Sequence, residues 1–130
     1  MNQYNLEDGS GFFVHHNSGN WRVAVHNYEE NINGKAAFHL WGCHHSSEEA
    51  FVILQGEGFL VIASDKEGEQ FQVYPLKSMH LFVVGCAEYH ALLLRKGASV
   101  LIIENKDMTN SESVVMKSGV IAEVFKECKI

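Results

Sequence analysis

Short runs of apolar residues, separated by residues that favour turns, recur along almost the whole chain. Strand-like apolar and alternating runs occur at 12–16, 21–26, 36–43, 51–54, 59–63, 70–74, 81–84, 90–94, 100–104 and 113–116. Gly, Asn and Asp lie between many of these runs, as expected for tight turns. Many short strands at close spacing are typical of a sandwich or a barrel, rather than of alternating strands and helices. The pattern therefore predicts an all-β protein.

Two segments at the ends of the chain carry local signals of their own. Residues 12–26 form a predicted hairpin, with its turn at Gly19. Near the C-terminus the spacing changes to that of a helix, with apolar residues at Val120, Ile121, Val124, Phe125 and Cys128. This spacing predicts a helix at about 119–128, with Ser118 available as its N-cap. We expect the helix to pack on the barrel as a lid.

Length and charge limit the class of protein. The chain has 130 residues, of which 46% are hydrophobic and 20% charged, which fits one globular domain over residues 1–130. The formal net charge of −6 repels a phosphate backbone, and no cluster of Lys and Arg offsets it. No apolar stretch approaches the length of a membrane span. We therefore expect neither nucleic acid nor a membrane as partner.

The N-terminal residues and the cysteines predict the compartment. Residues 1–5 lack the basic region and the apolar run of a secretory signal. The three cysteines are too few, and odd in number, for a disulfide framework: Cys43, Cys86 and Cys128. We therefore expect a cytoplasmic protein.

Candidate metal ligands gather in the segment that follows Gly42. Side chains alternate between the two faces of a strand, so Cys43 and His45 share a face and His44 is expected to point outward. If the backbone stays extended through the next residues, Glu49 joins that face. Imidazole, carboxylate and thiolate are donors that bind divalent metals.

The spacing in this segment resembles the first motif of the cupin superfamily. That motif runs Gly, five residues, His-x-His, three or four residues, Glu, six residues and Gly. His45, Glu49 and Gly56 match its second His, its Glu and its last Gly, and Cys43 stands in place of the first His. The match predicts a cupin-like site in this part of the chain.

A second, weaker likeness follows further along the chain. The second cupin motif runs Gly, five residues, Pro-x-Gly, two residues, His, three residues and Asn, and only its His is present, as His90. The resemblance covers roughly residues 36–104 and implies a double-stranded β-helix, or jelly-roll barrel, with a short C-terminal helix. Residues 101–107 are similar to the end of the last core strand in small stand-alone bacterial cupins of unassigned activity.

The resemblance also implies a metal centre. In cupins the two histidines and the Glu of the first motif, with the His of the second, coordinate a divalent metal ion such as Zn, Mn, Fe or Ni. If these roles apply to this chain, the ligands are His45, Glu49 and His90. Cys43 is a ligand only if it substitutes for the first His of the motif. A thiolate from Cys43 would favour zinc. The alternatives are hydrogen-bonded core histidines and a buried, packing thiol.

Three functions follow from these expectations. The first is a metal-binding cupin that holds a small polar ligand in the barrel, with no reaction or catalytic residue assigned. The second is a metal-free binding or regulatory module, favoured by the missing first His. The third is a structural dimer whose pocket is filled by side chains such as Trp41 and Phe51. A homodimer is expected because an open barrel exposes edge strands, which the segment 12–25 of a partner could cover.

Overall fold

Ten antiparallel strands, one short 3-10 helix and one α-helix make up the computed structural model, which describes residues 1–130. The elements are β1 (Phe12–Ser18), β2 (Trp21–Asn27), η1 (Lys35–Ala37), β3 (Leu40–His44), β4 (Glu49–Gln55), β5 (Gly58–Ala63), β6 (Phe71–Pro75), β7 (Phe82–Val84), β8 (Tyr89–Leu94), β9 (Ser99–Asn105), β10 (Ser111–Val115) and α1 (Ser118–Cys128). The N-terminal hairpin, the C-terminal helix and a strand in each predicted region are present, but the strand predicted at 36–43 begins only at Leu40, after η1.

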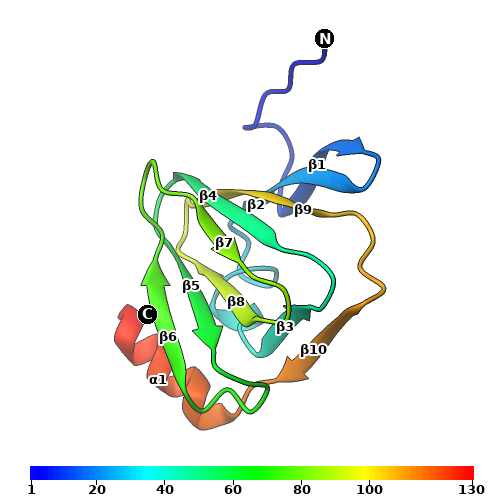
Figure 1. Ribbon diagram of the computed structural model, residues 1–130. Helices are drawn as coiled ribbons and strands as arrows, with labels where there is room; N and C mark the ends of the chain where they lie inside the picture. Colours follow the sequence, from blue (N-terminus) through cyan, green and yellow to red (C-terminus); the bar gives the residue numbers. More distant parts are fainter.

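The strands form two facing sheets of five strands each (Figure 1). Sheet A has the order β1-β2-β9-β4-β7, and sheet B has the order β10-β3-β8-β5-β6. From β3 onward the chain crosses repeatedly between the sheets, because β3, β5, β8 and β10 belong to sheet B and β4, β7 and β9 to sheet A. This crossing is that of a jelly-roll barrel, as the sequence predicted.

Apolar side chains fill the space between the two sheets. Alternation along β5 directs Leu60 into this space, whereas Val61 packs on the other side of sheet B. The inner cluster draws on both sheets and on the loops beside them: Phe51, Ile53, Leu60, Leu76, Val84, Leu94, Ala98, Val100 and Ile102. Burial of these side chains holds the sheets together.

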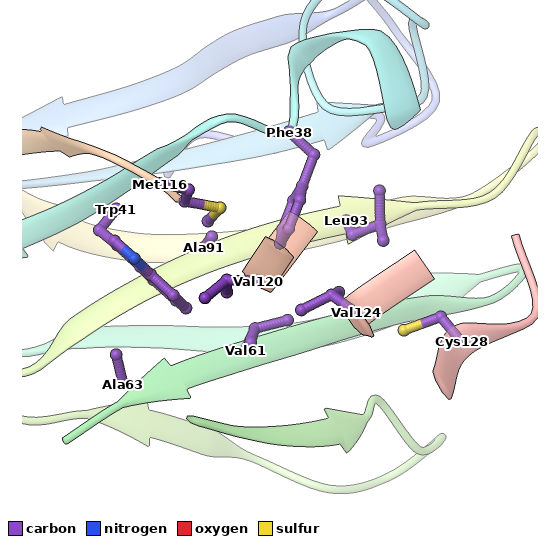
Figure 2. Close-up of a cluster of buried hydrophobic side chains, with 10 residues drawn as sticks. All are labelled: Phe38, Trp41, Val61, Ala63, Ala91, Leu93, Met116, Val120, Val124 and Cys128. Atoms are coloured by element: carbon purple, nitrogen blue, oxygen red, sulfur yellow. The ribbon is translucent and has the colours of Figure 1, made fainter. Parts of the chain in front are cut away.

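Helix α1 covers the outer face of sheet B, as expected for a lid. Val120, Val124 and Cys128 recur at helical spacing and pack against strand residues such as Val61 and Leu93 (Figure 2). The helix begins at Ser118, but its N-cap is Lys117 and no side chain caps it, so the expected capping role of Ser118 is wrong. With 11 residues, α1 is too short to span a membrane.

Trp41 belongs to this outer cluster, not to the barrel interior. Its side chain is fully buried beside α1 (Figure 2), so the prediction that Trp41 fills the pocket is wrong, whereas Phe51 does lie inside. Gly68, which has a φ of 70°, lies against the indole, and a Cβ there would come within 2.2 Å of its Nε1 atom. The β5–β6 loop needs glycine at this position because any side chain would collide with Trp41.

Candidate metal centre

Three side chains meet inside the barrel at one end. His44 ends β3, Glu49 begins β4 and His90 lies near the start of β8. The Nε2 atom of His44 lies 2.9 Å from Oε1 of Glu49, and Nε2 of His90 lies 3.1 Å from the same oxygen. One potential ligand atom from each residue lies within 4.8 Å of the other two. This donor set, two imidazoles and one carboxylate, is one that binds divalent transition metals.

The pairing of the strands places these residues. Gly42 of β3 pairs with His90 of β8, so His44 lies two residues further along β3 on the same inner face. The centroids of the two imidazole rings are 5.2 Å apart. Glu49 reaches them from the facing sheet A, where it pairs with Val84. The centre therefore bridges the two sheets.

The second nitrogen of each imidazole has a partner of its own. The Nδ1 atom of His44 lies 2.8 Å from the hydroxyl oxygen of Ser111 on β10. The Nδ1–H group of His90 donates to the backbone carbonyl of Glu88, at 3.1 Å. Contacts of this kind orient metal-binding histidines and leave Nε2 as the nitrogen that each ring offers to a partner. Both rings thus direct Nε2 toward Glu49.

The electrostatics of the centre favour an ionised carboxylate. Burial would by itself raise the pKa of Glu49, but hydrogen bonds from His44 and His90 lower that pKa to about 2. The hydrogen bond to Glu49 in turn raises the pKa of His44. The pKa of Glu104, which lies beside Glu49, is raised by burial and by the charge of Glu49, although Arg22 donates to Glu104 at 2.6 Å. Glu49 is therefore the charged residue among the three candidate ligands.

The predicted set of residues is only partly brought together. Glu49 and His90 meet as expected, but His44 meets them in place of His45. His45 lies on the outer face of sheet B, where its Nε2 atom is 3.0 Å from Oε1 of Glu112. Cys43 shares that outer face, as strand alternation predicted, and is fully buried. The prediction that His44 points outward is wrong.

The reason lies in the connection between β3 and β4. Residues 45–48 form a bend and an irregular stretch, not an extended strand. Because β3 belongs to sheet B and β4 to sheet A, the alternation of side chains is not carried from Cys43 to Glu49. The alternation of side chains predicted the correct faces within β3. It gave a wrong prediction for Glu49 relative to Cys43, because the chain changes sheets between them.

The structure also changes how the chain matches the cupin motif. With His44 as the second His, four residues precede Glu49, which is the longer of the two spacings that the motif allows. Gly42 then occupies the position of the first His. A Cβ built at Gly42 would lie 3.9 Å from Cε1 of His90, which is an ordinary contact. The chain thus lacks a side chain at this position beside His90.

An apolar pocket of about 180 Å³ lies next to the centre. Two of its lining residues are the cross-strand neighbours of the candidate ligands, because Ile62 pairs with His90 and Val84 pairs with Glu49. The pocket is lined by Leu60, Ile62, Tyr74, Phe82, Val83, Val84 and Glu88. A wider pocket of about 480 Å³ shares Ile62, Tyr74 and Glu88 with it.

Sequence reasoning missed three residues of this region. His44 could have been found from the longer motif spacing, which leaves four residues before Glu49. Glu104 shares the strand face of the buried Ile102, so alternation along β9 predicts that it points into the barrel. Nothing in the sequence marks Ser111, because its contact with His44 depends on the pairing of β10 with β3.

Comparison with known proteins shows the fold. No protein-family model matches the chain, and no curated protein matches it in sequence. An RmlC-like cupin protein from Desulfovibrio desulfuricans superposes with a TM-score of 0.58 at 21% identity, over 81% of this chain and 96% of that one. A cupin-2 domain containing protein from Shewanella frigidimarina gives a TM-score of 0.56 at 14% identity, over 76% and 84%.

An enzyme shares the fold more distantly. Hydroxypropylphosphonic acid epoxidase from S. wedmorenis, in complex with fosfomycin, superposes with a TM-score of 0.51 at 18% identity, over 66% of this chain and 43% of that one. The protein therefore has the fold of the cupin superfamily. It combines that fold with a set of candidate metal ligands in the barrel, which His44, Glu49 and His90 supply.

Proposed function

We propose that the protein binds one divalent metal ion through His44, Glu49 and His90, and that this metal holds a small molecule in the barrel. The observation that carries the proposal is the convergence of two Nε2 atoms on one buried carboxylate oxygen, at 2.9 and 3.1 Å. Both Nδ1 atoms have other partners, so Nε2 is the nitrogen that each ring offers to a ligand.

Hydrogen bonding favours a ligand role over a simple core role. His90 faces an acceptor at each nitrogen, the carbonyl oxygen of Glu88 at Nδ1 and the carboxylate of Glu49 at Nε2. A neutral imidazole has only one N–H group and cannot donate to both. As a core residue, His90 would need a second proton in a buried site, whereas as a ligand its Nε2 lone pair would face a cation.

The donor set limits the metal. Two imidazoles and one carboxylate suit Fe, Mn, Ni or Zn and leave coordination positions for other ligands. Cys43 lies on the opposite face of β3 and gives this centre no thiolate. When bound, such a metal supplies a Lewis acid that polarises an oxygen of a bound molecule. Gly42 leaves space beside His90, so that a polar group of the bound molecule can approach.

The surroundings of the centre suit a particular kind of small molecule. Six of the seven residues that line the 180 Å³ pocket are hydrophobic, and Ile62 and Val84 join the pocket to the candidate ligands. A molecule with a polar, metal-binding group and a small apolar part would place the first at His44 and Glu49 and the second in the pocket. We infer that the small polar ligand expected from the sequence has such an apolar part.

Metal titration of matched variants tests the proposal. The starting chain carries Cys43→Ser and Cys86→Ser, so that neither thiol competes for the ion. We expect it to bind one Co²⁺ per chain, followed by its visible absorption and by elemental analysis. Adding His44→Ala should abolish this binding, and adding His45→Ala should leave it intact, because the two side chains lie on opposite faces of sheet B. Equal binding by the two variants, or no binding by the starting chain, would overturn the proposal.

A further inference from the structure

A second group of potential ligands lies on the outer face of sheet B. Cys43 lies on β3, His45 follows directly after the last residue of β3, and Glu112 lies on β10. One ligand atom from each of the three lies within 4.8 Å of the other two. The hydroxyl group of Tyr89 on β8 also donates to Oε1 of Glu112, the oxygen that contacts His45. Thiol, imidazole and carboxylate thus meet at one point outside the barrel.

We propose that Cys43, His45 and Glu112 form a second metal site, which binds zinc or a similarly soft divalent ion. Zinc takes Cys, His and carboxylate ligands in tetrahedral sites, and three protein ligands leave one position for water. The soft thiolate distinguishes this site from the centre inside the barrel, where all donors are nitrogen or oxygen. The proposal stands independently of the metal centre proposed above.

Sheet geometry brings the three donors together. Cys43 lies on β3 and pairs directly with Glu112. His45 follows the last residue of β3 and lies on the same outer face as Cys43, where its Nε2 atom contacts Glu112. The backbone N–H of His45 donates to the carbonyl of Asn110 at 2.9 Å, which continues the pairing with the β10 side beyond β3. The donors are thus positioned by backbone hydrogen bonds before any ion binds, which reduces the cost of forming the site.

The three candidate ligands of this site differ in their exposure to solvent. Cys43 is fully buried, whereas the side chains of His45 and Glu112 are 37% and 41% exposed. Solvent therefore reaches the site at His45 and Glu112 and not at Cys43. A bound ion would also join β3 to the edge strand β10, which carries the Ser111 that contacts His44.

Cobalt absorption separates this site from the one inside the barrel. The test uses full-length protein carrying Cys86→Ser, which removes the exposed thiol. We expect a second Co²⁺ per chain that gives a thiolate-to-cobalt charge-transfer band in the near ultraviolet. Cys43→Ser should remove that band and one equivalent of bound Co²⁺. His45→Ala and Glu112→Gln should weaken binding of this second Co²⁺ at least tenfold. Cys128→Ser is the control and should change neither the band nor the number of bound ions.

The same experiment distinguishes failure of the two proposals. His44→Ala should leave the charge-transfer band in place, because His44 faces the barrel. If Cys43→Ser does not fold, the His45 and Glu112 variants still test the site, because these two side chains are partly exposed and their replacement disturbs the core less. Absence of the band from the starting protein, or a band that survives Cys43→Ser, would overturn the second site, whatever happens at the first.

Discussion

His44 and His45 are neighbours in sequence whose side chains lie on opposite faces of sheet B. The Nε2 atom of His44 lies 2.9 Å from Glu49 inside the barrel. The Nε2 atom of His45 lies 3.0 Å from Glu112 outside it. Alternation at the end of β3, between its last residue and the residue that follows, thus gives two adjacent histidines different carboxylate partners and different chemical surroundings.

Ser111 should support the metal centre without binding the ion. Its hydroxyl oxygen lies 2.8 Å from Nδ1 of His44, where it orients the ring. We expect Ser111→Ala to lower the affinity of the inner site by about tenfold, as is common when such a supporting contact is lost. Ser113→Ala, on the same strand opposite Gly42, is the matched control and should have no effect. Competition with a fluorescent chelator measures both affinities.

Gly42 should be the position at which a further ligand can be added. A Cβ there makes only ordinary contacts with His90, so the first atom of a side chain fits at this position. We expect Gly42→His to raise metal affinity, and a gain of about 1.4 kcal/mol would be a tenfold increase. Gly42→Ala should leave the affinity unchanged. Weaker binding by the histidine variant would show that the space beside His90 is not a coordination position.

These predictions depend on details that the sequence does not contain. The barrel could be predicted because apolar alternation and turn residues are local features, and Glu49 and His90 were found through motif spacing. The choice between His44 and His45 depends on the bend at residues 45–48, where the chain crosses from one sheet to the other. Contacts such as that of Ser111 depend on long-range strand pairing, which spacing along one chain does not reveal.

His26 should make the metal-free protein sensitive to mild acid. Burial lowers the pKa of His26 to about 4, although the charge of Glu49 acts in the opposite direction. The side-chain amide of Asn33 donates to Nδ1 of His26 at 3.1 Å, which also favours the neutral ring. Between pH 6.5 and about 4 the unfolded chain binds this proton and the folded chain does not, so stability falls as the pH falls.

The size of this effect can be measured by difference. The interval between about 4 and 6.5 corresponds to about 3 kcal/mol of unfolding free energy, lost gradually as the pH is lowered. Urea unfolding of His26→Asn should show a smaller loss of stability over this interval than the parent protein. His80→Asn, at an exposed position, should behave like the parent. If the unfolding free energy of His26→Asn falls with pH as steeply as that of the parent, His26 is not the cause of the acid sensitivity.

The outer face of sheet A should carry the contact of a homodimer. Helix α1 covers sheet B, whereas Ile103 and Val83 on sheet A are 42% and 49% exposed. Ala50 pairs with both of them, so the three form one continuous apolar row. We expect light scattering to give a dimer, and Ile103→Asp to give a monomer. Val115→Asp, on sheet B, should remain dimeric, and a monomeric parent at high concentration would contradict the prediction.

The most direct measurement of the central claim is an anomalous-difference map from a crystal of the metal-loaded protein. We predict a peak inside the barrel, with Nε2 of His44, an oxygen of Glu49 and Nε2 of His90 each within about 2.0–2.3 Å of it. A loaded crystal whose map has no peak between these three residues, or in which Glu49 and the two histidines remain hydrogen-bonded to one another, would contradict the account.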